Sequence, residues 1–436
     1  MGSGNPAGEA GARVSPEGNP ALPSLGRKAF VLASWLAAAN VLQLLIGFWR
    51  EHLLGPWLGP ERMGSLGFAL ALAGTADMVV QAGLGPVLTR DVAADPRKDG
   101  AHLGTALAMR SVYMALALPV LVWLGGPFAA LYLVGLTGQL GVAVLRAKML
   151  KSPQVAATLL PPVFSLGLVA VCWKWAEPSA PVALAALAGA FCLAAAFQLP
   201  LAFSRLKSRL AWSWSLAARA FRGAWPLWLA GVAVAFLYRI DVFLLKALLD
   251  GAAADRAIGL YRPAYTLVES GHFVLGSLVA VAFPAMAALT RGPTARLRAV
   301  YGRAVAWSVG LGLLAMVAAL LLGGPALILI YREGFAPAVP ALQVLSPALV
   351  FVLLNGLTTS LLTALHRTRT VLVIVLGQFA AKAALSLVLI PRFGFTGAAA
   401  ASVAAEAAGT LVLLVVAARY LAARQAREAG ERGSRG

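Results

Sequence analysis

The sequence predicts an all-α, polytopic membrane protein with about twelve transmembrane helices, arranged as two six-helix bundles around a central cavity. Composition is the first observation: of 436 residues, 60% are hydrophobic and 12% are charged, and the mean hydropathy is +0.81. A soluble domain cannot bury so large an apolar share, whereas a membrane protein exposes it to lipid. The second observation is length, because the apolar runs reach the roughly 20 residues that a helix needs to cross a bilayer.

Charge distribution is the third observation. The formal net charge is +19, but the basic residues lie in short runs between apolar segments, a pattern typical of membrane orientation rather than of nucleic-acid binding. With the N-terminus placed inside, every even-numbered span ends in a basic segment. The first apolar run begins only after Arg27-Lys28 and has full span length, so no cleavable signal peptide is expected. We therefore expect a multi-pass protein of the bacterial cytoplasmic (inner) membrane with both termini in the cytoplasm.

The elements follow in order along the chain. Residues 1–26 are rich in Gly, Pro, Ser and Glu, which predicts a disordered cytoplasmic tail. Pro161-Pro162 interrupts the fifth span, where neighbouring helices or water must satisfy the freed carbonyls. The twelve spans are expected at 29–49, 63–88, 102–124, 126–145, 154–173, 180–203, 224–248, 257–289, 302–322, 338–365, 371–391 and 395–418.

Residues 204–223 carry an apolar stripe from Leu206 to Phe221 with basic residues around it. This pattern predicts an amphipathic helix on the inner leaflet, with a partner-binding helix as the alternative. The helix would link a first bundle over 27–203 to a second over 224–419, followed by a basic cytoplasmic tail over 420–436.

The two halves of the chain also contain similar short motifs. GPVLTRD (Gly85 to Asp91) is matched by MAALTRG (Met286 to Gly292), and GGPFAALYLVG (Gly125 to Gly135) by GGPALILIYREG (Gly323 to Gly334). Both pairs occupy the same relative places in the order of spans. Their succession favours a duplicated architecture of six plus six helices.

The eighth span carries one polar face. Tyr261, Tyr265, Glu269 and His272 follow one another at spacings of three and four, while the rest of the span is largely apolar. Ionisable groups at membrane depth normally face a bundle interior or a wet cavity, so this helix is expected to form a cavity wall. Glu269 and His272 could exchange protons near neutral pH or form a satisfied polar pair.

Charged groups inside the spans mark the candidate site, because each costs about 2.5–3.5 kcal/mol at the bilayer centre. Arg239 and Asp241 diverge on one helix, so Asp241 is expected to meet Arg262 or Lys382, either as a structural ion pair or as part of a substrate or coupling-ion site. For Asp77 and Glu406 we favour packing. The charged groups are Asp77, Arg110, Arg239, Asp241, Lys246, Arg262, Glu269, Lys382 and Glu406.

Cavity arginines suit an anionic, phosphorylated substrate, because guanidinium binds phosphate through two hydrogen bonds and stays charged. Arg110, Arg239 and Arg262 are the candidates. No phosphate-binding glycine loop, metal-ligand spacing or nucleophile elbow is present, and Cys172 and Cys192 lie apart in apolar spans. We therefore expect no catalytic residue, no metal and no cofactor, and a protein that is not an enzyme.

Several stretches, taken in order, resemble the polysaccharide-biosynthesis flippases, the Wzx-like oligosaccharide-lipid exporters of the multidrug/oligosaccharidyl-lipid/polysaccharide (MOP) superfamily. They are LGPERMG (Leu58 to Gly64), GLGPVLTRDVA (Gly83 to Ala93), YRIDVFLLKALL (Tyr238 to Leu249), AIGLYRPAYTLVES (Ala257 to Ser270) and LIPRFGFTGAAAASVAAE (Leu389 to Glu406). The resemblance implies two helical bundles around an alternately open cavity and a drive other than ATP. It also implies a polyprenyl-diphosphate-linked sugar as substrate, held by Arg262 and Arg239, with Asp241 at the family's usual aspartate.

Two positions depart from the family pattern. Many relatives place arginine directly before the first-loop LGP, where this chain has Pro56-Trp57 and its nearest arginine is Arg50. The branch that moves peptidoglycan precursor tends to carry arginine about where Tyr265 stands. These departures favour surface-glycan export over peptidoglycan export.

The expected function is therefore flipping of a lipid-linked oligosaccharide, a surface-polysaccharide or O-antigen precursor. The expected partners are this substrate and membrane lipids, with a glycan polymerase or glycosyltransferases as further candidates and no nucleic acid. A cation-coupled multidrug exporter using Asp77 and Glu269 is one alternative. A non-transporting membrane scaffold for glycan synthesis is the other.

Overall fold

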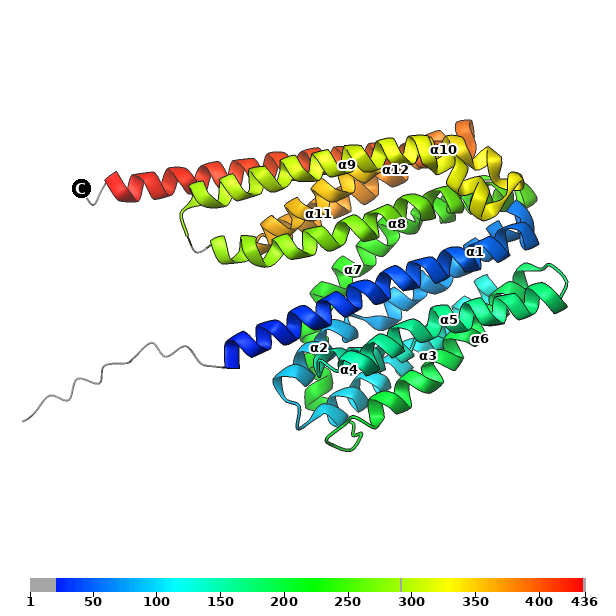
Figure 1. Ribbon diagram of the computed structural model, residues 1–436, viewed down its shortest axis with the longest axis horizontal. Helices are drawn as coiled ribbons and strands as arrows, with labels where there is room; N and C mark the ends of the chain where they lie inside the picture. The colour runs from blue at the N-terminus through cyan, green and yellow to red at the C-terminus, as the bar shows by residue number, and fades with distance from the viewer. Residues whose placement is uncertain (1–20, 291, 434–436) are drawn as a thin grey trace, which may run out of the picture.

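The computed structural model describes residues 21–290 and 292–433, and throughout these ranges the regular elements are helices (Figure 1). In chain order they are α1 (Ala21–Gln81), α2 (Leu84–Ala94), α3 (Asp99–Gly135), α4 (Gly138–Ala147), α5 (Lys151–Trp175), α6 (Ala180–Phe203), α7 (Trp214–Leu248), α8 (Gly251–Leu289), α9 (Thr294–Tyr331), the 3₁₀ helix η1 (Glu333–Ala338), α10 (Val339–Leu345), α11 (Ala348–Ala364) and α12 (Thr368–Gly433).

Glycines break the helical backbone inside α1, α3 and α12, at the point where one span ends and the next begins. The backbone leaves the helical region at Gly59 (φ 68°), Gly126 (φ 78°) and Gly394 (φ 57°), inside α1, α3 and α12 respectively. Glycine adopts positive φ at little cost, so each site allows the chain to turn back across the membrane. Among the described residues, six helices are long and apolar enough to span, or seven if the bent unit Glu333–Leu345 with Ala348–Ala364 is one span. Nine of the twelve predicted spans lie within a single helix, and the other three, 63–88, 126–145 and 338–365, each cross a short break between consecutive helices.

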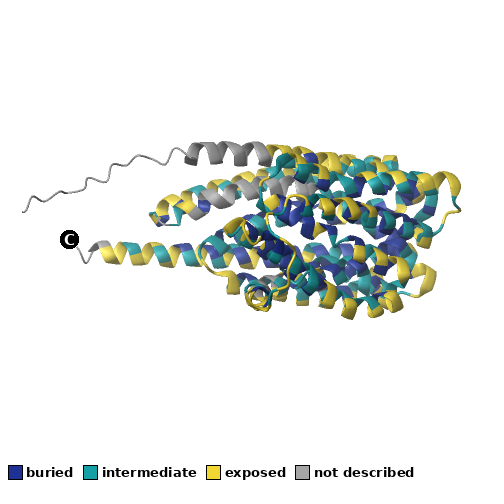
Figure 2. Cartoon of the chain, turned by 90° about the horizontal axis from the view of Figure 1, so that it is seen from below, coloured by how far each residue is buried: buried dark blue, intermediate teal, exposed yellow. Residues whose placement is uncertain are grey.

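The helices form two lobes, α1–α6 and α7–α12, which converge at one end and separate toward the end where α12 leaves the bundle (Figure 1). We call these the convergent end and the termini end. Buried residues gather inside the lobes, while exposed residues cover the outer helix faces (Figure 2). Many of the exposed side chains are large and apolar, including Leu116, Trp123, Trp307 and Leu329. An apolar outer surface is what contact with lipid requires.

At the convergent end, α1 and α8 cross with their backbones in direct contact. A β-carbon on Gly64 would overlap the carbonyl oxygen of Asp255, and one on Gly259 would overlap the carbonyl oxygen of Pro60. Glycine at both positions therefore lets the two lobes meet without a gap. This crossing closes the space between the lobes at that end.

The region between the lobes differs from the single amphipathic helix that we predicted. Residues 204–213 are not helical, and α7 starts at Trp214 with Ser213 as its N-cap. The side chain of Asp99 accepts hydrogen bonds from the backbone N–H groups of Lys207 and Ser208, which occupies amides that a helix would use. We call residues 204–213 the linker.

Two further predictions need correction. Residues 21–26 belong to α1 rather than to a tail, while residues 1–20 lie outside the described ranges. The predicted basic tail from 420 continues α12 as far as Gly433. The two GGP motifs are not equivalent turns either. The backbone breaks at Gly126 in the first half, but α9 continues through Gly323–Pro325 and ends before Arg332 (φ 68°).

Candidate substrate site between the lobes

Two adjoining cavities lie between the lobes. The arginine cavity, of about 230 Å³, is lined by Arg50, Leu70, Gly74, Asp77, Met78, Tyr132, Leu136, Leu187, Phe191, Arg239 and Arg262. The amide cavity, of about 520 Å³, is lined by Asn40, Gln43, Leu44, Gly47, Phe48, Arg50, Glu51, Gln139, Val142, Arg146, Ala157, Thr158, Pro161, Pro162, Ser165, Phe191, Gln198, Thr266, Glu269 and Ser270. Arg50 and Phe191 line both, so one bound molecule can occupy the two spaces.

Both lobes contribute to the arginine cavity. Arg239 of α7 and Arg262 of α8 belong to the second lobe, and both lie against α1 of the first. A β-carbon at Gly74 would stand 2.7 Å from Nη1 of Arg239, and one at Gly67 would stand 3.1 Å from Cδ of Arg262. Because these glycines are seven residues apart, they lie on one face of α1 about two turns apart. Because Gly67 and Gly74 have no side chains, α1 leaves space for the guanidinium groups of Arg262 and Arg239.

Arg239 and Arg262 are available for an anion. Among the described residues, the ion pairs do not include either side chain. Arg50 differs, because its Nη2 lies 2.8 Å from Oε1 of Glu51, while its Nε is buried without a hydrogen-bond partner in the described part of the chain. Three guanidinium groups thus border one small cavity, and two of them belong to no ion pair among the residues that the structure describes.

The amide cavity has a different chemistry. Four of its lining side chains are primary amides: Asn40, Gln43, Gln139 and Gln198. Hydroxyl groups of threonine and serine line it as well, and Gln198 is held by a 2.7 Å hydrogen bond that its Nε2 donates to the carbonyl oxygen of Ala157. Amides and hydroxyls both donate and accept hydrogen bonds, as sugar hydroxyls require. Charged side chains also line the cavity, namely Arg50, Glu51, Arg146 and Glu269, so the lining as a whole is polar and suits a hydroxylated group.

Arg110, the third predicted cavity arginine, lies outside both linings. Its side chain is 1% exposed, its Nη2 lies 2.7 Å from Oδ1 of Asp77, and it also donates to Thr137 and to the carbonyl oxygen of Leu133. The pair joins α3 to α1 inside the first lobe. Asp77 still borders the arginine cavity, but its charge is matched by Arg110.

Asp241 meets Lys382 rather than Arg262, with 2.7 Å between Oδ2 and Nζ. The same carboxylate oxygen accepts hydrogen bonds from the hydroxyls of Tyr261 (2.7 Å) and Ser402 (2.9 Å), and Lys382 also donates to the carbonyl oxygen of Leu237. Asp241 is completely buried and lines neither cavity. The cluster ties α7, α8 and α12 together within the second lobe.

The wet face of α8 is rotated from the predicted one. Arg262, Thr266, Glu269 and Ser270 reach the cavities, at spacings of four, three and one. Tyr261 turns toward Asp241, and Tyr265 packs against Tyr261 with ring centroids 5.6 Å apart. The side chain of His272 lies outside the described part of α8. One residue corresponds to about 100° around a helix, so adjacent positions face different surroundings.

Sequence reasoning missed the contribution of the first span. Asn40, Gln43, Gly47 and Arg50 line the cavities from α1. Their spacings of three, four and three mark one helical face, a signal of the same kind as the one used for α8.

The comparisons with known proteins agree with this architecture. The family described as polysaccharide biosynthesis protein matches residues 32–290. No curated protein sequence matches the chain. An inward-facing multidrug-resistance MATE family transporter of the MOP superfamily is similar in structure, with a TM-score of 0.72 at 13% identity over 87% of this chain and 95% of that one.

Two further solved structures share the fold. The lipid II flippase MurJ in an inward closed conformation has a TM-score of 0.71 at 12% identity, covering 88% of this chain and 87% of its own. An outward-facing MATE family transporter has a TM-score of 0.61 at 15% identity, covering 90% and 96%. The family match covers more than half of the 436 residues. The chain therefore belongs to the polysaccharide biosynthesis protein family and has the fold of the MOP superfamily transporters.

Proposed function

We propose that this protein flips a polyprenyl-diphosphate-linked oligosaccharide, a surface-polysaccharide precursor, across the bacterial cytoplasmic membrane by alternating access. The observation that carries the proposal is the arginine cavity, where Arg239 and Arg262 lie beside Arg50 and form no ion pair with any described carboxylate. Guanidinium is the group best suited to a diphosphate, because it forms paired, charge-assisted hydrogen bonds and keeps its charge at every working pH.

The two cavities divide the substrate between them. The diphosphate occupies the arginine cavity, and the sugars next to it occupy the amide cavity, whose volume of about 520 Å³ is in the range of small-molecule sites. The prenyl chain stays in the lipid. These groups bind and orient, and the proposal assigns no bond-breaking step to them.

The cavity between the lobes is closed at the convergent end, so we infer that it opens toward the termini end. The Gly64–Gly259 crossing holds that end closed, and the TM-score is higher for the inward-facing MATE structure than for the outward-facing one. With both termini in the cytoplasm, as the basic segments favour, this is an inward-facing state. Transport then requires the crossing to open while the termini end closes.

The cation-coupled drug exporter is the second candidate. Glu269 supports it, because this carboxylate lines the amide cavity and belongs to no ion pair among the described residues. Asp77, the other acidic group it would use, is already paired with Arg110. Susceptibility to cationic drugs in a strain lacking other exporters separates the two candidates.

The binding test uses the purified protein and a labelled polyprenyl-diphosphate oligosaccharide. Arg239→Ala and Arg262→Ala are each expected to weaken binding by at least about tenfold, because a charge-assisted hydrogen bond contributes roughly 1.5–3 kcal/mol. Arg256→Ala is the matched control, since Arg256 is an exposed arginine of the same helix as Arg262 and lines neither cavity. Unchanged affinity in both cavity variants would reject the assignment.

A further inference from the structure

A separate pocket of about 440 Å³ lies at the termini end of the first lobe. It is formed by the end of α2, the turn between α4 and α5, and the linker. Three of its lining residues are basic, namely Lys148, Arg205 and Lys207, and acidic residues are absent from its lining. The remaining lining residues are Val92, Ala93, Pro96, Ala147, Met149 and Leu150. The pocket is therefore cationic on one side and apolar on the other.

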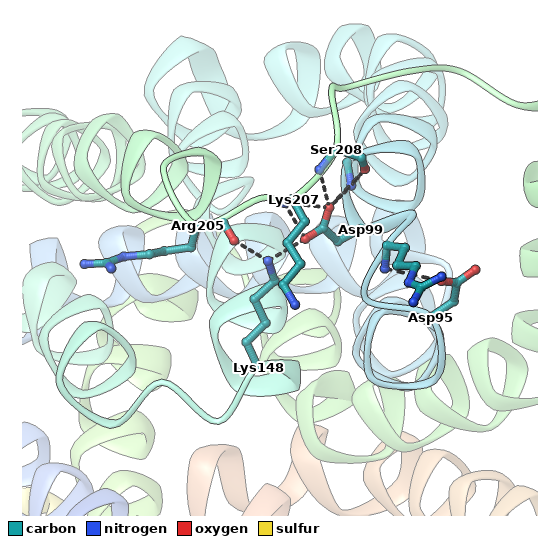
Figure 3. Close-up of polar contacts among 8 residues, drawn as sticks. Asp95, Asp99, Lys148, Arg205, Lys207 and Ser208 are labelled. Atoms are coloured by element: carbon teal, nitrogen blue, oxygen red, sulfur yellow. Dashed lines mark hydrogen bonds and ion pairs between the residues drawn. The ribbon is translucent and has the colours of Figure 1, made fainter.

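Asp99 fixes the backbone that carries two of these cations. Its carboxylate is completely buried and accepts hydrogen bonds from the N–H groups of Lys207 (2.8 Å) and Ser208 (3.0 Å) and from the hydroxyl of Ser208 (3.0 Å). Lys148 donates both to Asp99 and to the carbonyl oxygen of Arg205 (Figure 3). Since the linker is held at four points, the side chains at 205 and 207 extend from a pre-organised backbone.

Glycine allows this close approach. A β-carbon at Gly104 would stand 2.7 Å from the carbonyl oxygen of Ala211, and one at Gly100 would overlap the linker backbone at Ser208. The linker therefore lies directly on the first turns of α3 and moves with the first lobe.

The positive charge of the pocket is not neutralised locally. Asp99 matches Lys148, but the side chains of Arg205 and Lys207 are exposed and belong to no ion pair among the described residues. Figure 3 shows them leaving the linker in different directions, so they flank the pocket instead of converging on one point. Helix α5 also starts here, directly after Leu150, without a side-chain cap, and the partial positive charge of its first turn adds to the field.

We propose that this pocket binds the phosphate headgroup of an anionic glycerophospholipid. The phosphate lies by Lys207, Arg205 contributes from the other side, and the glycerol and first methylenes contact the apolar wall at the exposed Ala93 and Met149. Inorganic phosphate shares the charge chemistry, but it would leave that wall uncovered. The site is separate from the arginine and amide cavities, so this inference does not rest on the transported substrate.

The test titrates the full-length protein in detergent with phosphatidylglycerol, phosphatidylcholine or inorganic phosphate, and follows lipid binding by native mass spectrometry together with the thermal unfolding midpoint. Phosphatidylglycerol is expected to bind and to raise the midpoint, because a ligand of the folded state stabilises it. The double variant Arg205→Gln/Lys207→Gln is expected to bind phosphatidylglycerol about a hundredfold or more weakly, which corresponds to the loss of two charge-assisted contacts.

Arg209→Gln is the matched control, because Arg209 is exposed on the same linker but does not line the pocket. It is expected to bind like the wild type. An equal loss in Arg209→Gln would assign the effect to general surface charge and overturn the site. Equal binding of phosphatidylcholine would overturn recognition of the anionic headgroup, and stabilisation by inorganic phosphate without phosphatidylglycerol binding would overturn the lipid.

Discussion

The guanidinium of Arg239 on α7 lies over Gly74 on α1, so close that a β-carbon at Gly74 would stand 2.7 Å from Nη1. This contact crosses from one lobe to the other and sets the position of a cavity arginine. Gly74→Ala is expected to displace the guanidinium tip of Arg239 and to weaken substrate binding about tenfold, since one charge-assisted hydrogen bond contributes roughly 1.5–3 kcal/mol.

The measurement is affinity for a labelled polyprenyl-diphosphate oligosaccharide. Gly47→Ala provides the control, because Gly47 also lines a cavity from α1 but has open space where the β-carbon would be. Equal effects of the two substitutions would show that Gly74 does not act through Arg239.

The buried pair of Arg110 and Asp77 predicts a loss of stability. Arg110→Ala leaves Asp77 as an uncompensated charge in the first lobe, where breaking a buried pair costs about 3–5 kcal/mol. Thermal unfolding in detergent is expected to show a clear drop in the midpoint for Arg110→Ala and little change for Arg262→Ala, which has no ion-pair partner to lose among the described residues. The opposite order would place Arg110 in the binding site.

The Gly64–Gly259 crossing predicts a shift of conformation. In Gly64→Ala, the new methyl group overlaps the carbonyl oxygen of Asp255, and rotation of a side chain cannot relieve an overlap with backbone. We expect the lobes to separate at the convergent end. Spin labels at the exposed positions 61 and 253, with Cys172 and Cys192 replaced, measure this distance.

The distance distribution of Gly64→Ala should move to longer values, while that of Gly47→Ala should match the parent. A folded Gly64→Ala protein with the parent distribution contradicts the view that this crossing closes the cavity.

For the Asp241–Lys382 pair, we predict that the double variant keeps more folded protein and more export activity than either single variant. Each single substitution, Asp241→Asn or Lys382→Met, leaves one buried charge unpaired and should lower folded yield and export strongly. The double variant removes both charges and should regain most of the folded protein and of the export activity. A double variant that folds but does not export would show that the pair takes part in coupling rather than in packing alone.

The sequence predicted most of the fold because lipid imposes simple constraints. Apolar length and the alternation of basic segments located the twelve spans. The breaks at Gly126 and Gly394 lie at expected span boundaries, whereas the break at Gly59 lies inside the loop expected over 50–62. The prediction of a helix over the linker was wrong because the conformation of this segment depends on a residue distant in sequence. Its apolar stripe suggested a helix, but the carboxylate of Asp99, more than one hundred residues earlier, accepts hydrogen bonds from the backbone N–H groups that a helix would use.

The candidate site was predicted only in part, because the sequence identifies charged residues inside spans but not the neighbours that they meet in the fold. Arg239 and Arg262 could be chosen because a charge inside a span must face protein or water. Arg50 lies just outside the first predicted span, 29–49, and only the packing of the lobes brings it to the same cavity. Arg110 and Arg262 look alike in sequence, and the difference between them is the neighbour that each meets: Asp77 for one and the space beside Gly67 for the other.

Flipping itself is the most direct test of the central claim. The protein is reconstituted in liposomes with a labelled polyprenyl-diphosphate oligosaccharide, and an external glycosidase reports how fast the inner-leaflet pool becomes accessible, with and without an imposed potential or pH gradient. The account predicts protein-dependent access that Arg239→Ala and Arg262→Ala abolish and Arg256→Ala preserves. Access that is absent with folded wild-type protein across several glycans, or that is equal in all four proteins, would contradict it.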